Sequence, residues 1–530
     1  MLKRKFIIIG LFVLSLVGIT SCTAVTDWLS PKPESQIVLD EYWKSATDVQ
    51  SVLASCYRGL TQDDNIYSMI VWGELRSDNM TIGSGFASDR SDMQKILIGS
   101  ITSENKYCSW GSFYTVINYC NTLLYYAPIV MQRDYNFTQS DLNRVKAEAL
   151  TIRALCYFYL VRSFKEVPWI KEASIDNTQK YLLSKETEAN LINHIIADLD
   201  TARLYAQTDF GRTDYNKGRI TLNTVNALLA DVYLWNQDYD KCVQACDFVL
   251  ADKKLKLVQP PVSAYYSVFY TGNSTESIFE LQFKENVQVN NPVAKLYGSS
   301  ANILGEIGFP ATLAYDPKLK VRGGTTYSCP FAYPISSTIT ESPNDIRSID
   351  SYKLYGGQYF IFKYAGMLPD ETLAGRDIWR TNTANWIIYR LSDVMLMKAE
   401  ALVQLGGNSN LKNALLLVNQ TYLRSNTGKD SLNITNYGTQ TAMEDLVLRE
   451  RQREFLFEGK RWYDLVRMAR RDNSTDNLNM YVNNKSSGNS ATLGALVLDA
   501  MYMPIATSEL QANPNLKQNP FYKESSSITK

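Results

Sequence analysis

The sequence predicts a mostly α-helical protein, in which paired helices form a scaffold that one long irregular segment interrupts. Residues 142–164 carry two apolar stripes at helical spacing, the pattern of a helix that packs on more than one side. Residues 223–250 read as two helices joined by a turn, and residues 392–424 repeat that arrangement. Residues 251–389 are instead rich in glycine and proline, with only short candidate strands.

The chain opens with an export signal. Three basic residues at positions 3–5 precede an apolar run over residues 6–17. This run is shorter than the ~20 apolar residues that a membrane-spanning helix needs, so it predicts secretion. Small residues then lead to Cys22, an order that resembles the bacterial lipoprotein box, in which the cysteine is acylated. We therefore expect residues 1–21 to be removed and Cys22 to carry a lipid anchor.

Helices dominate the next part of the chain. Apolar periodicity predicts them over residues 40–60, 109–127, 142–164 and 188–205. The second should end before Pro128, because proline has no backbone N–H to continue a helix. Residues 65–103 contain glycine and serine and are weakly periodic, so we expect loops there.

Two segments resemble the helical hairpin of tetratricopeptide (TPR) repeats. Residues 223–250 place small and aromatic side chains on two helices joined by a short turn, and residues 392–405 with 411–424 repeat that order. Two further pairs fit the same plan: residues 142–164 with 188–205, and residues 443–457 with 461–471. About four TPR-like hairpins are therefore expected to form the scaffold, because stacked hairpins share one continuous core.

The segment 251–389 interrupts this scaffold. Short runs at residues 277–283, 359–363 and 386–389 predict strands within it. Long irregular insertions on a rigid scaffold commonly carry binding surfaces. We therefore expect the insertion to be loop-rich and to bind a ligand.

Composition and charge exclude several classes of function. The 530 residues carry 54 Lys+Arg against 54 Asp+Glu, and no basic run lies beyond the first five residues, so we expect no nucleic-acid partner. The single histidine, His194, rules out a multi-histidine metal site, and no nucleotide-binding or zinc-protease motif occurs. Seven cysteines besides Cys22 show no CxxC spacing, and their odd number leaves at least one thiol free. Cys242 and Cys246 lie four residues apart on a helical pattern, which favours core positions for these two, although an oxidising compartment permits disulfides. No cofactor and no metal site is predicted.

Residues 449–467 hold the densest group of carboxylates. A glycosidase needs two carboxyl groups that face each other across a sugar, and Glu450, Glu454 and Glu458 could share a helix face. Basic residues are interleaved with them, however, at the spacing of helical ion pairs, as in Glu450–Arg453, Glu458–Arg461 and Asp464–Arg467. Interleaved charges predict a structural ion-pair ladder, so we expect a binding protein and not an enzyme.

Motifs along the whole chain carry a family resemblance. They are Trp28-Leu29, Glu41-Tyr42-Trp43, the helix and turn at 147–168, the helix at 390–401, the ladder at 450–467 and the tail from Met503 to Tyr522. In this order they resemble the SusD/RagB family of outer-membrane nutrient-uptake lipoproteins. Two positions depart from the family pattern, since Lys165-Glu166 replaces Gly-Asp and Ala506 replaces a proline. Because glycine tolerates positive φ and lysine does not, the first departure affects the turn that ends a helix.

The resemblance implies a helical scaffold whose irregular segments build a glycan-binding face. It also implies a lipid-anchored, surface-exposed position on the outer membrane, beside a TonB-dependent transporter of the SusC type that receives the captured glycan uncleaved. We therefore expect the chain to divide into five regions: a signal peptide at 1–21, a tether at 22–40, an N-terminal SusD-like region at 41–250, a ligand-face insertion at 251–389 and a C-terminal SusD/RagB region at 390–530.

Aromatic residues make up 12% of the chain, and a flat aromatic face can stack on a sugar ring while polar side chains bind its hydroxyl groups. The ligand face is expected from the loops at 65–110 and the insertion at 265–385, where aromatic side chains lie outside helical stripes. Six residues are candidate ligand contacts: the aromatic Trp72, Tyr107 and Trp379, and the polar Arg76, Asp78 and Asn79. The alternative is that these aromatic side chains pack beneath long loops.

Other functions stay open at this point. Some members of the family bind peptides, and scaffold motifs do not separate them from glycan binders. A TPR-type adaptor would bind a protein at the membrane and keep it in the absence of sugar. A helical glycoside hydrolase would shorten its glycan.

Overall fold

The structure is a computed structural model. It describes residues 41–83, 91–175, 180–259, 264–284, 291–298, 305–311, 313, 319–320, 326–327, 331, 345–364, 367–370, 376–379, 383–485 and 496–523. The expected signal peptide, the tether with Cys22, and Cys329 lie outside these residues, as does the side chain of Trp379.

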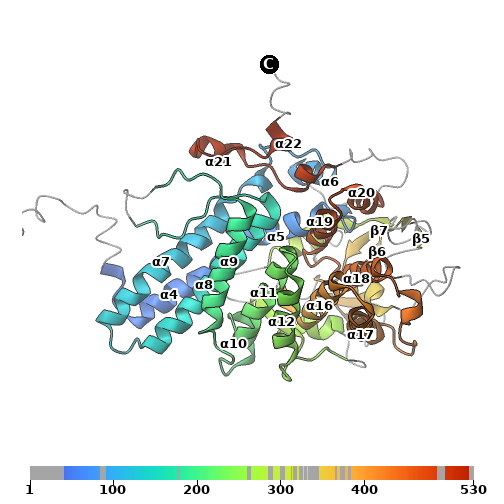
Figure 1. Ribbon diagram of the computed structural model, residues 1–530, viewed down its shortest axis with the longest axis horizontal. Helices are drawn as coiled ribbons and strands as arrows, with labels where there is room; N and C mark the ends of the chain where they lie inside the picture. Colours follow the sequence, from blue (N-terminus) through green and yellow to red (C-terminus); the bar gives the residue numbers. More distant parts are fainter. Residues whose placement is uncertain are drawn as a thin grey trace, which may run out of the picture.

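Helices make up most of the described chain (Figure 1). The long ones are α4 (Ala46–Leu60), α7 (Gly111–Arg133), α8 (Gln139–Phe164), α9 (Glu188–Arg203), α11 (Leu222–Trp235), α12 (Tyr239–Leu250), α16 (Leu391–Leu405), α17 (Asn408–Ser425), α18 (Gln440–Glu454) and α19 (Arg461–Asp472). The short ones are α5 (Asp63–Ile70), α6 (Ser91–Leu97), α10 (Thr213–Gly218), α13 (Val293–Tyr297), α15 (Ile346–Ser351), α20 (Asp476–Asn483), α21 (Thr507–Ala512) and α22 (Pro520–Lys523). Two π-helices, η1 (Val71–Leu75) and η4 (Tyr265–Thr271), and three 3₁₀-helices, η3 (Lys106–Cys108), η6 (Ile434–Asn436) and η7 (Leu498–Met501), complete this set.

The strands are short and antiparallel. One four-stranded sheet has the order β1 (Thr81–Ile82), β3 (Ile307–Phe309), β7 (Gln358–Ile361), β6 (Tyr352–Tyr355). The remaining strands form three pairs: β2 (Ser277–Leu281) with β10 (Trp386–Arg390), β4 (Leu319–Lys320) with β5 (Thr326–Tyr327), and β8 (Met367–Asp370) with β9 (Arg376–Trp379). In the β2–β10 pair Trp386 lies opposite Leu281, and the register shifts after Ile387. All three predicted strands are present.

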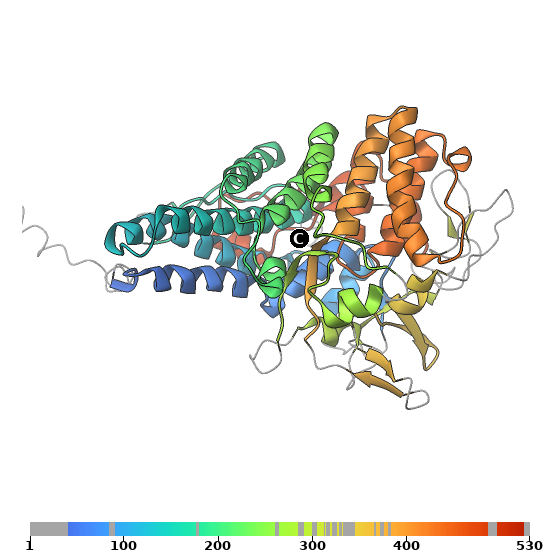
Figure 2. The same ribbon diagram turned by 90° about the horizontal axis from the view of Figure 1, so that it is seen from below.

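The long helices from α4 to α18 stack against one another in chain order (Figure 1). Helix α8 pairs with α9, α11 with α12, and α16 with α17, as the sequence predicts, and α12 packs on α16 to join the two halves of the scaffold. The strands and short helices of the insertion gather on one side of this scaffold, at the lower right of Figure 2. The mostly helical fold class is thus confirmed.

The fourth predicted helix pair is wrong. Helix α18 packs on α16 and α17, whereas α19 packs mainly on η1 and α20 and makes few contacts with α18. Phe457 and Gly459, between the two helices, both have positive φ, and the chain turns there. That turn separates α18 from α19.

The prediction of loops at 65–103 is also wrong, because α5, η1 and α6 lie there. Every residue of η1 is buried, so no polar face marks it as helical in the sequence. Helix α7 likewise continues through Pro128 to Arg133. Proline costs an interior helix one hydrogen bond, and in α7 this loss does not end the helix.

Both ends of α8 follow from local side chains. At its start, Thr138 and Asp141 form a capping box, in which the Thr138 hydroxyl oxygen accepts from the Asp141 amide at 3.2 Å. At its end, Lys165 has a φ of 69°, in the left-handed region that favours glycine. The position where the family usually has glycine therefore keeps the glycine-like turn, with lysine in it.

Buried apolar side chains form one large cluster and a smaller one between α16, α17 and α18. The large cluster includes six free thiols, at Cys56, Cys108, Cys120, Cys156, Cys242 and Cys246. The expectation of core positions is confirmed for Cys242 and Cys246, and the other four thiols are buried as well. Within the described chain, no helix is both long and apolar enough to cross a membrane.

Candidate ligand-binding site

The structure places five of the six predicted ligand contacts in the interior. Only 1% of Trp72 is exposed; its ring stacks on Phe113, and its Nε1 donates to the Tyr107 carbonyl oxygen at 2.7 Å. Tyr107 is buried as well. These two aromatic side chains are therefore packed in the interior, Trp72 against α7 and α8, and present no open ring face to a sugar. Trp379 ends β9, and because its side chain is outside the described part, its role stays a prediction.

The three polar candidates bind other parts of the protein. Arg76 donates to a backbone carbonyl oxygen at 2.6 Å, and Asn79 donates to Glu74 at 2.7 Å. Asp78 forms a two-point ion pair with Arg461, at 2.9 and 3.0 Å. All three are buried, so the expectation that they face a ligand is corrected. They fix the chain after η1 to the C-terminal part of the protein.

The carboxylates of residues 449–467 lie in the interior and not along one open helix face. Two of the three predicted ion pairs form, Glu450–Arg453 at 3.0 Å and Asp464–Arg467 at 2.7 Å. In place of the third, Arg461 pairs with Asp78. The reason is the turn between α18 and α19, which removes the helical spacing that the pair Glu458–Arg461 requires.

Glu454 lies at the centre of a buried ion network. Arg347, Arg390 and Arg424 each donate to its carboxylate, at 2.5 to 2.9 Å. Arg390 and Arg424 also pair with Glu276, which directly precedes β2. Because Arg347 and Glu276 belong to the insertion, this network attaches the insertion to the helical scaffold.

The same network keeps these carboxylates ionised. Burial opposes the ionisation of Glu450, but Arg347 and Arg453 outweigh it and lower the pKa of Glu450 to about 2. Arg424 and Arg390 similarly hold the pKa of the buried Glu454 well below its usual range. A carboxylate that is ionised at neutral pH has no proton to donate, so neither residue fits the general acid of a glycosidase.

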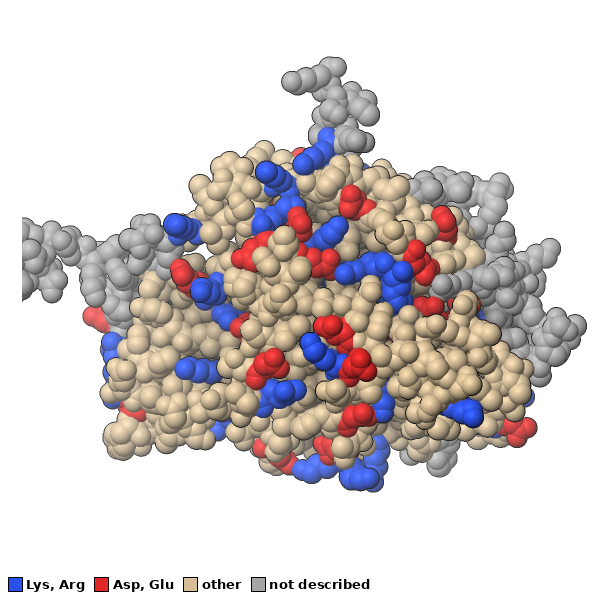
Figure 3. Space-filling view, in the orientation of Figure 1, with Lys and Arg blue, Asp and Glu red and all other residues tan. Residues whose placement is uncertain are grey.

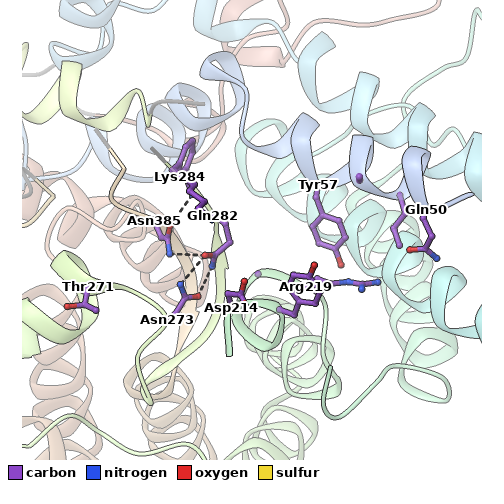
Figure 4. A pocket seen from close by; sticks show the side chains of 14 residues that line it. Gln50, Tyr57, Asp214, Arg219, Thr271, Asn273, Gln282, Lys284 and Asn385 are labelled. Atoms are coloured by element: carbon purple, nitrogen blue, oxygen red, sulfur yellow. Dashed lines mark hydrogen bonds between the residues drawn. The ribbon is translucent and has the colours of Figure 1, made fainter. Parts of the chain in front are cut away.

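A separate cavity of about 590 Å³ opens between α4, α10 and the end of β2 (Figure 4). Its polar lining includes Gln50 and Tyr57 of α4, Asp214 of α10, Gln282 and Asn385. Its apolar lining includes Leu53 and Phe283. This volume lies in the range of small-molecule sites, roughly 300–1,000 Å³. We call it the first cavity.

Three carboxamides form one wall of the first cavity. Asn273 and Gln282 exchange two hydrogen bonds, at 2.9 and 3.0 Å, and Asn385 donates to Gln282 at 3.1 Å (Figure 4). Asn385 also donates to the buried Glu280 at 2.7 Å. Because each amide fixes the next, the wall holds neutral donor and acceptor groups in set positions.

The opposite wall centres on Tyr57. Its hydroxyl group donates to Glu148 at 2.6 Å and accepts from the Ile220 amide at 2.9 Å. Burial, together with the charge of Glu148, raises the pKa of Tyr57 well above its usual value, so the phenol stays protonated. Arg219 forms a two-point ion pair with Glu148, which compensates its charge. This wall therefore combines an aromatic ring with a paired guanidinium group.

Sequence reasoning missed the first cavity, although one signal was present. Gln282 is a carboxamide within the predicted strand 277–283, and Asn385 directly precedes the predicted strand 386–389. It also missed Tyr266 and Tyr270 of η4, whose rings stack with centroids 5.4 Å apart. Tyr266 is 42% exposed, and the next residue after Tyr270, Thr271, lines the first cavity.

A metal site is not apparent in the described residues, since no group of three or more His, Cys, Asp or Glu among them could hold an ion. His194 is engaged locally instead, stacking on Trp169 at 4.6 Å and lying 3.1 Å from Glu186.

Two family models match this chain. Residues 27–234 match a model described as starch-binding associating with outer membrane, and residues 336–522 match the model of the SusD family. The chain belongs to the SusD family. The first cavity draws Tyr57 and Arg219 from one matched segment and Asn385 from the other, whereas Asn273 and Gln282 lie between the two.

Relatives of this SusD-family protein match over nearly its full length. SusD-like protein P2 of Formosa agariphila is 25% identical over 487 residues, 86% of this chain and 90% of the relative. A SusD-like protein of Bacteroides ovatus is 25% identical over 529 residues, which cover 92% of this chain and 86% of the relative.

Solved structures share the fold. A SusD superfamily protein from Bacteroides vulgatus has a TM-score of 0.69 at 21% identity, covering 90% of this chain and 99% of the other. NanU of B. fragilis has a TM-score of 0.65 at 20% identity, and the match covers 93% of this chain and 99% of NanU.

Proposed function

We propose that this SusD-family protein binds oligosaccharide or polysaccharide nutrients at the cell surface and delivers them, uncleaved, to a TonB-dependent transporter of the SusC type in the outer membrane. A lipid anchor at Cys22 would hold it there. Membership of the SusD family and the match to a starch-binding, outer-membrane model support the general class.

The first cavity carries the proposal about the ligand. Sugar hydroxyl groups both donate and accept hydrogen bonds, and carboxamides do the same. The wall of Asn273, Gln282 and Asn385 supplies such groups in fixed positions, while Tyr57 and Phe283 supply apolar surface for the C–H faces of a sugar ring. Fixed partners lower the ordering cost of binding.

The test is binding to a panel of polymers by affinity electrophoresis in gels that contain soluble starch, xylan, laminarin or alginate. Ala54, an exposed residue of α4, lines the first cavity, so Ala54→Trp should fill it and lower affinity for the retained polymer at least tenfold. Ser51→Trp, at an exposed position of the same helix that does not line the cavity, is the matched control and should bind normally.

Other outcomes identify the alternatives. Retention of peptides from a casein digest, with no polymer retained, would favour a peptide-binding member of the family. Shortening of the polymer during incubation would reveal a hydrolase. Copurification of one protein that soluble glycan neither promotes nor displaces would favour an adaptor.

A further inference from the structure

A second cavity of about 230 Å³ lies next to the first. Asn273 lines both, and the short helix α10 contributes to both. Asp214 and Gly218 of α10 border the first cavity, whereas Asn216 and Lys217 border the second. The two cavities are therefore neighbours. The residues of α10 and Asn273 separate them, and we call this boundary the ridge.

The ridge is held firmly in place. The Lys217 amino group donates to the carbonyl oxygen of Ser277, the first residue of β2. Asn273 exchanges two hydrogen bonds with Gln282, and its amide donates to Glu280. The separation of the two cavities is therefore built into the fold.

The second cavity is also lined by hydrogen-bonding groups, but several of them are charged and none is aromatic. Asp209 accepts from the Asn216 carboxamide and from Lys254, each at 2.7 Å, and Asp252 accepts from Asn223 at 2.7 Å. These hydrogen bonds and the Lys254 charge lower the pKa of Asp209, which keeps it an acceptor at neutral pH. Hydroxyl groups complete the lining, from Thr208, Thr213, Thr221, Ser274 and Thr275.

We infer that the two cavities are adjacent subsites of one binding path for an extended, hydroxyl-rich glycan chain, which crosses the ridge at α10. This rests on the proposed function. The second cavity is smaller than a typical small-molecule site, roughly 300 Å³ at the lower limit, so it would hold only part of a ligand anchored elsewhere. Linked subsites raise affinity without new kinds of contact, because the second binding event is intramolecular.

The inference predicts that affinity depends on chain length. The probes are size-fractionated oligosaccharides, two to eight units long, from a partial hydrolysate of the polymer retained in the panel of starch, xylan, laminarin and alginate. Calorimetry should show at least a tenfold gain in affinity between the shortest chain that binds and the longest. Equal affinity across the series would overturn the inference while leaving the proposed function intact.

Variants test whether the second cavity is the source of the increase in affinity with chain length. Thr275 is exposed, lines the second cavity and donates its hydroxyl group to a backbone carbonyl oxygen, that of Lys256. Thr275→Trp should abolish the gain in affinity with chain length and leave the shortest chain bound as in the wild type. Thr213→Trp, at an exposed position of α10 that also lines the second cavity, should do the same. Thr201→Trp is the control, since Thr201 is also exposed and bonds to a carbonyl oxygen but lines neither cavity.

The pattern of losses distinguishes the two proposals. If Thr275→Trp and Thr213→Trp both bind long chains as Thr201→Trp does, the second subsite does not exist. If no polymer in the panel binds at all, the proposed function fails and the subsite fails with it.

Discussion

Glu450, Glu454 and Glu458 follow one another at intervals of four residues, and shared arginines link them: Arg347 pairs with the first two and Arg390 with the last two. Glu450 pairs with Arg347 and Arg453, and Glu458 pairs with Lys363 and Arg390. The side chains of these glutamates and their basic partners are all buried. A buried ion pair is a weak source of net stability, but removal of one partner leaves an uncompensated charge in the interior.

Removal of one carboxylate should therefore destabilise the fold. We expect Glu454→Gln to lower the free energy of unfolding by roughly 3–5 kcal/mol, because three arginines lose their common partner. Glu458→Gln should act in the same direction. Denaturant unfolding measures this, with Glu172→Gln at an exposed position as the control.

Ligand affinity tests whether this role is structural. For both variants, measured well below their melting temperatures, affinity for the retained polymer should stay within about twofold, or ~0.4 kcal/mol. A variant that melts like the wild type but no longer binds would show that the carboxylate contacts ligand.

The ion network also predicts sensitivity to acid. The folded-state pKa of Glu450 is about 2, below the ordinary value of 4.5. A lowered folded-state pKa means that this stabilisation is complete above about pH 4.5 and is lost as pH falls towards 2. Denaturant unfolding at pH 7, 5, 4 and 3 should show stability falling most steeply below pH 4.5. A Glu450→Gln variant should show a shallower fall over that interval.

At the scale of elements, η1 lies very close to the turn before α19. A methyl group on Gly73 would overlap the carbonyl oxygen of Gly459, and Gly459 itself has a φ of 73°. Glu74, next to Gly73, accepts from the backbone amides of Phe457 and Lys460 at 3.3 and 2.9 Å. Two segments far apart in the sequence are thus in close contact and are joined by the Glu74 carboxylate.

We expect Gly73→Ala to destabilise the protein by about 3 kcal/mol or more, because the backbone of the turn must move to admit the methyl group. Gly111→Ala is the matched control. Gly111 begins α7, and the atom nearest to an added methyl group there is 3.7 Å away, so alanine should be neutral or stabilising. Thermal unfolding of the two variants gives the comparison, and equal melting temperatures would contradict the close approach.

At the scale of the whole molecule, the insertion and the scaffold form one body. The Glu276 and Arg347 ion pairs attach the insertion to α17 and α18, and β2 pairs with β10 directly before α16. The first cavity takes residues from both parts. Its carboxamide wall lies partly between the segments that match family models.

The anchor is a prediction for the whole molecule, because it decides where the protein acts. We expect Cys22→Ala to move the protein from the membrane fraction to the soluble fraction, since each buried CH₂ of an acyl chain adds ~0.8 kcal/mol of membrane affinity. Fractionation of cells that express each form measures this. Equal amounts of wild type and variant in the membrane fraction would refute the anchor.

The sequence by itself determined the helical fold class, three of the helix pairs, the three predicted strands and the family. These depend on local patterns: apolar periodicity, turn residues and motifs that each lie within a short stretch of chain. The ion pairs Glu450–Arg453 and Asp464–Arg467 were predictable for the same reason, since one helix sets their spacing.

Only the tertiary structure decided which side chains are available to a ligand. Trp72 and Asp78 lie in a segment whose sequence shows no helical periodicity. Both side chains are buried by contacts with distant residues: their hydrogen-bond partners, Tyr107 and Arg461, are 35 and 383 residues away in the chain. The first cavity likewise exists because Gln282 meets Asn385 and Tyr57 meets Ile220. Burial and cavities arise from contacts between segments distant in the chain, and no local pattern in a single sequence records those contacts.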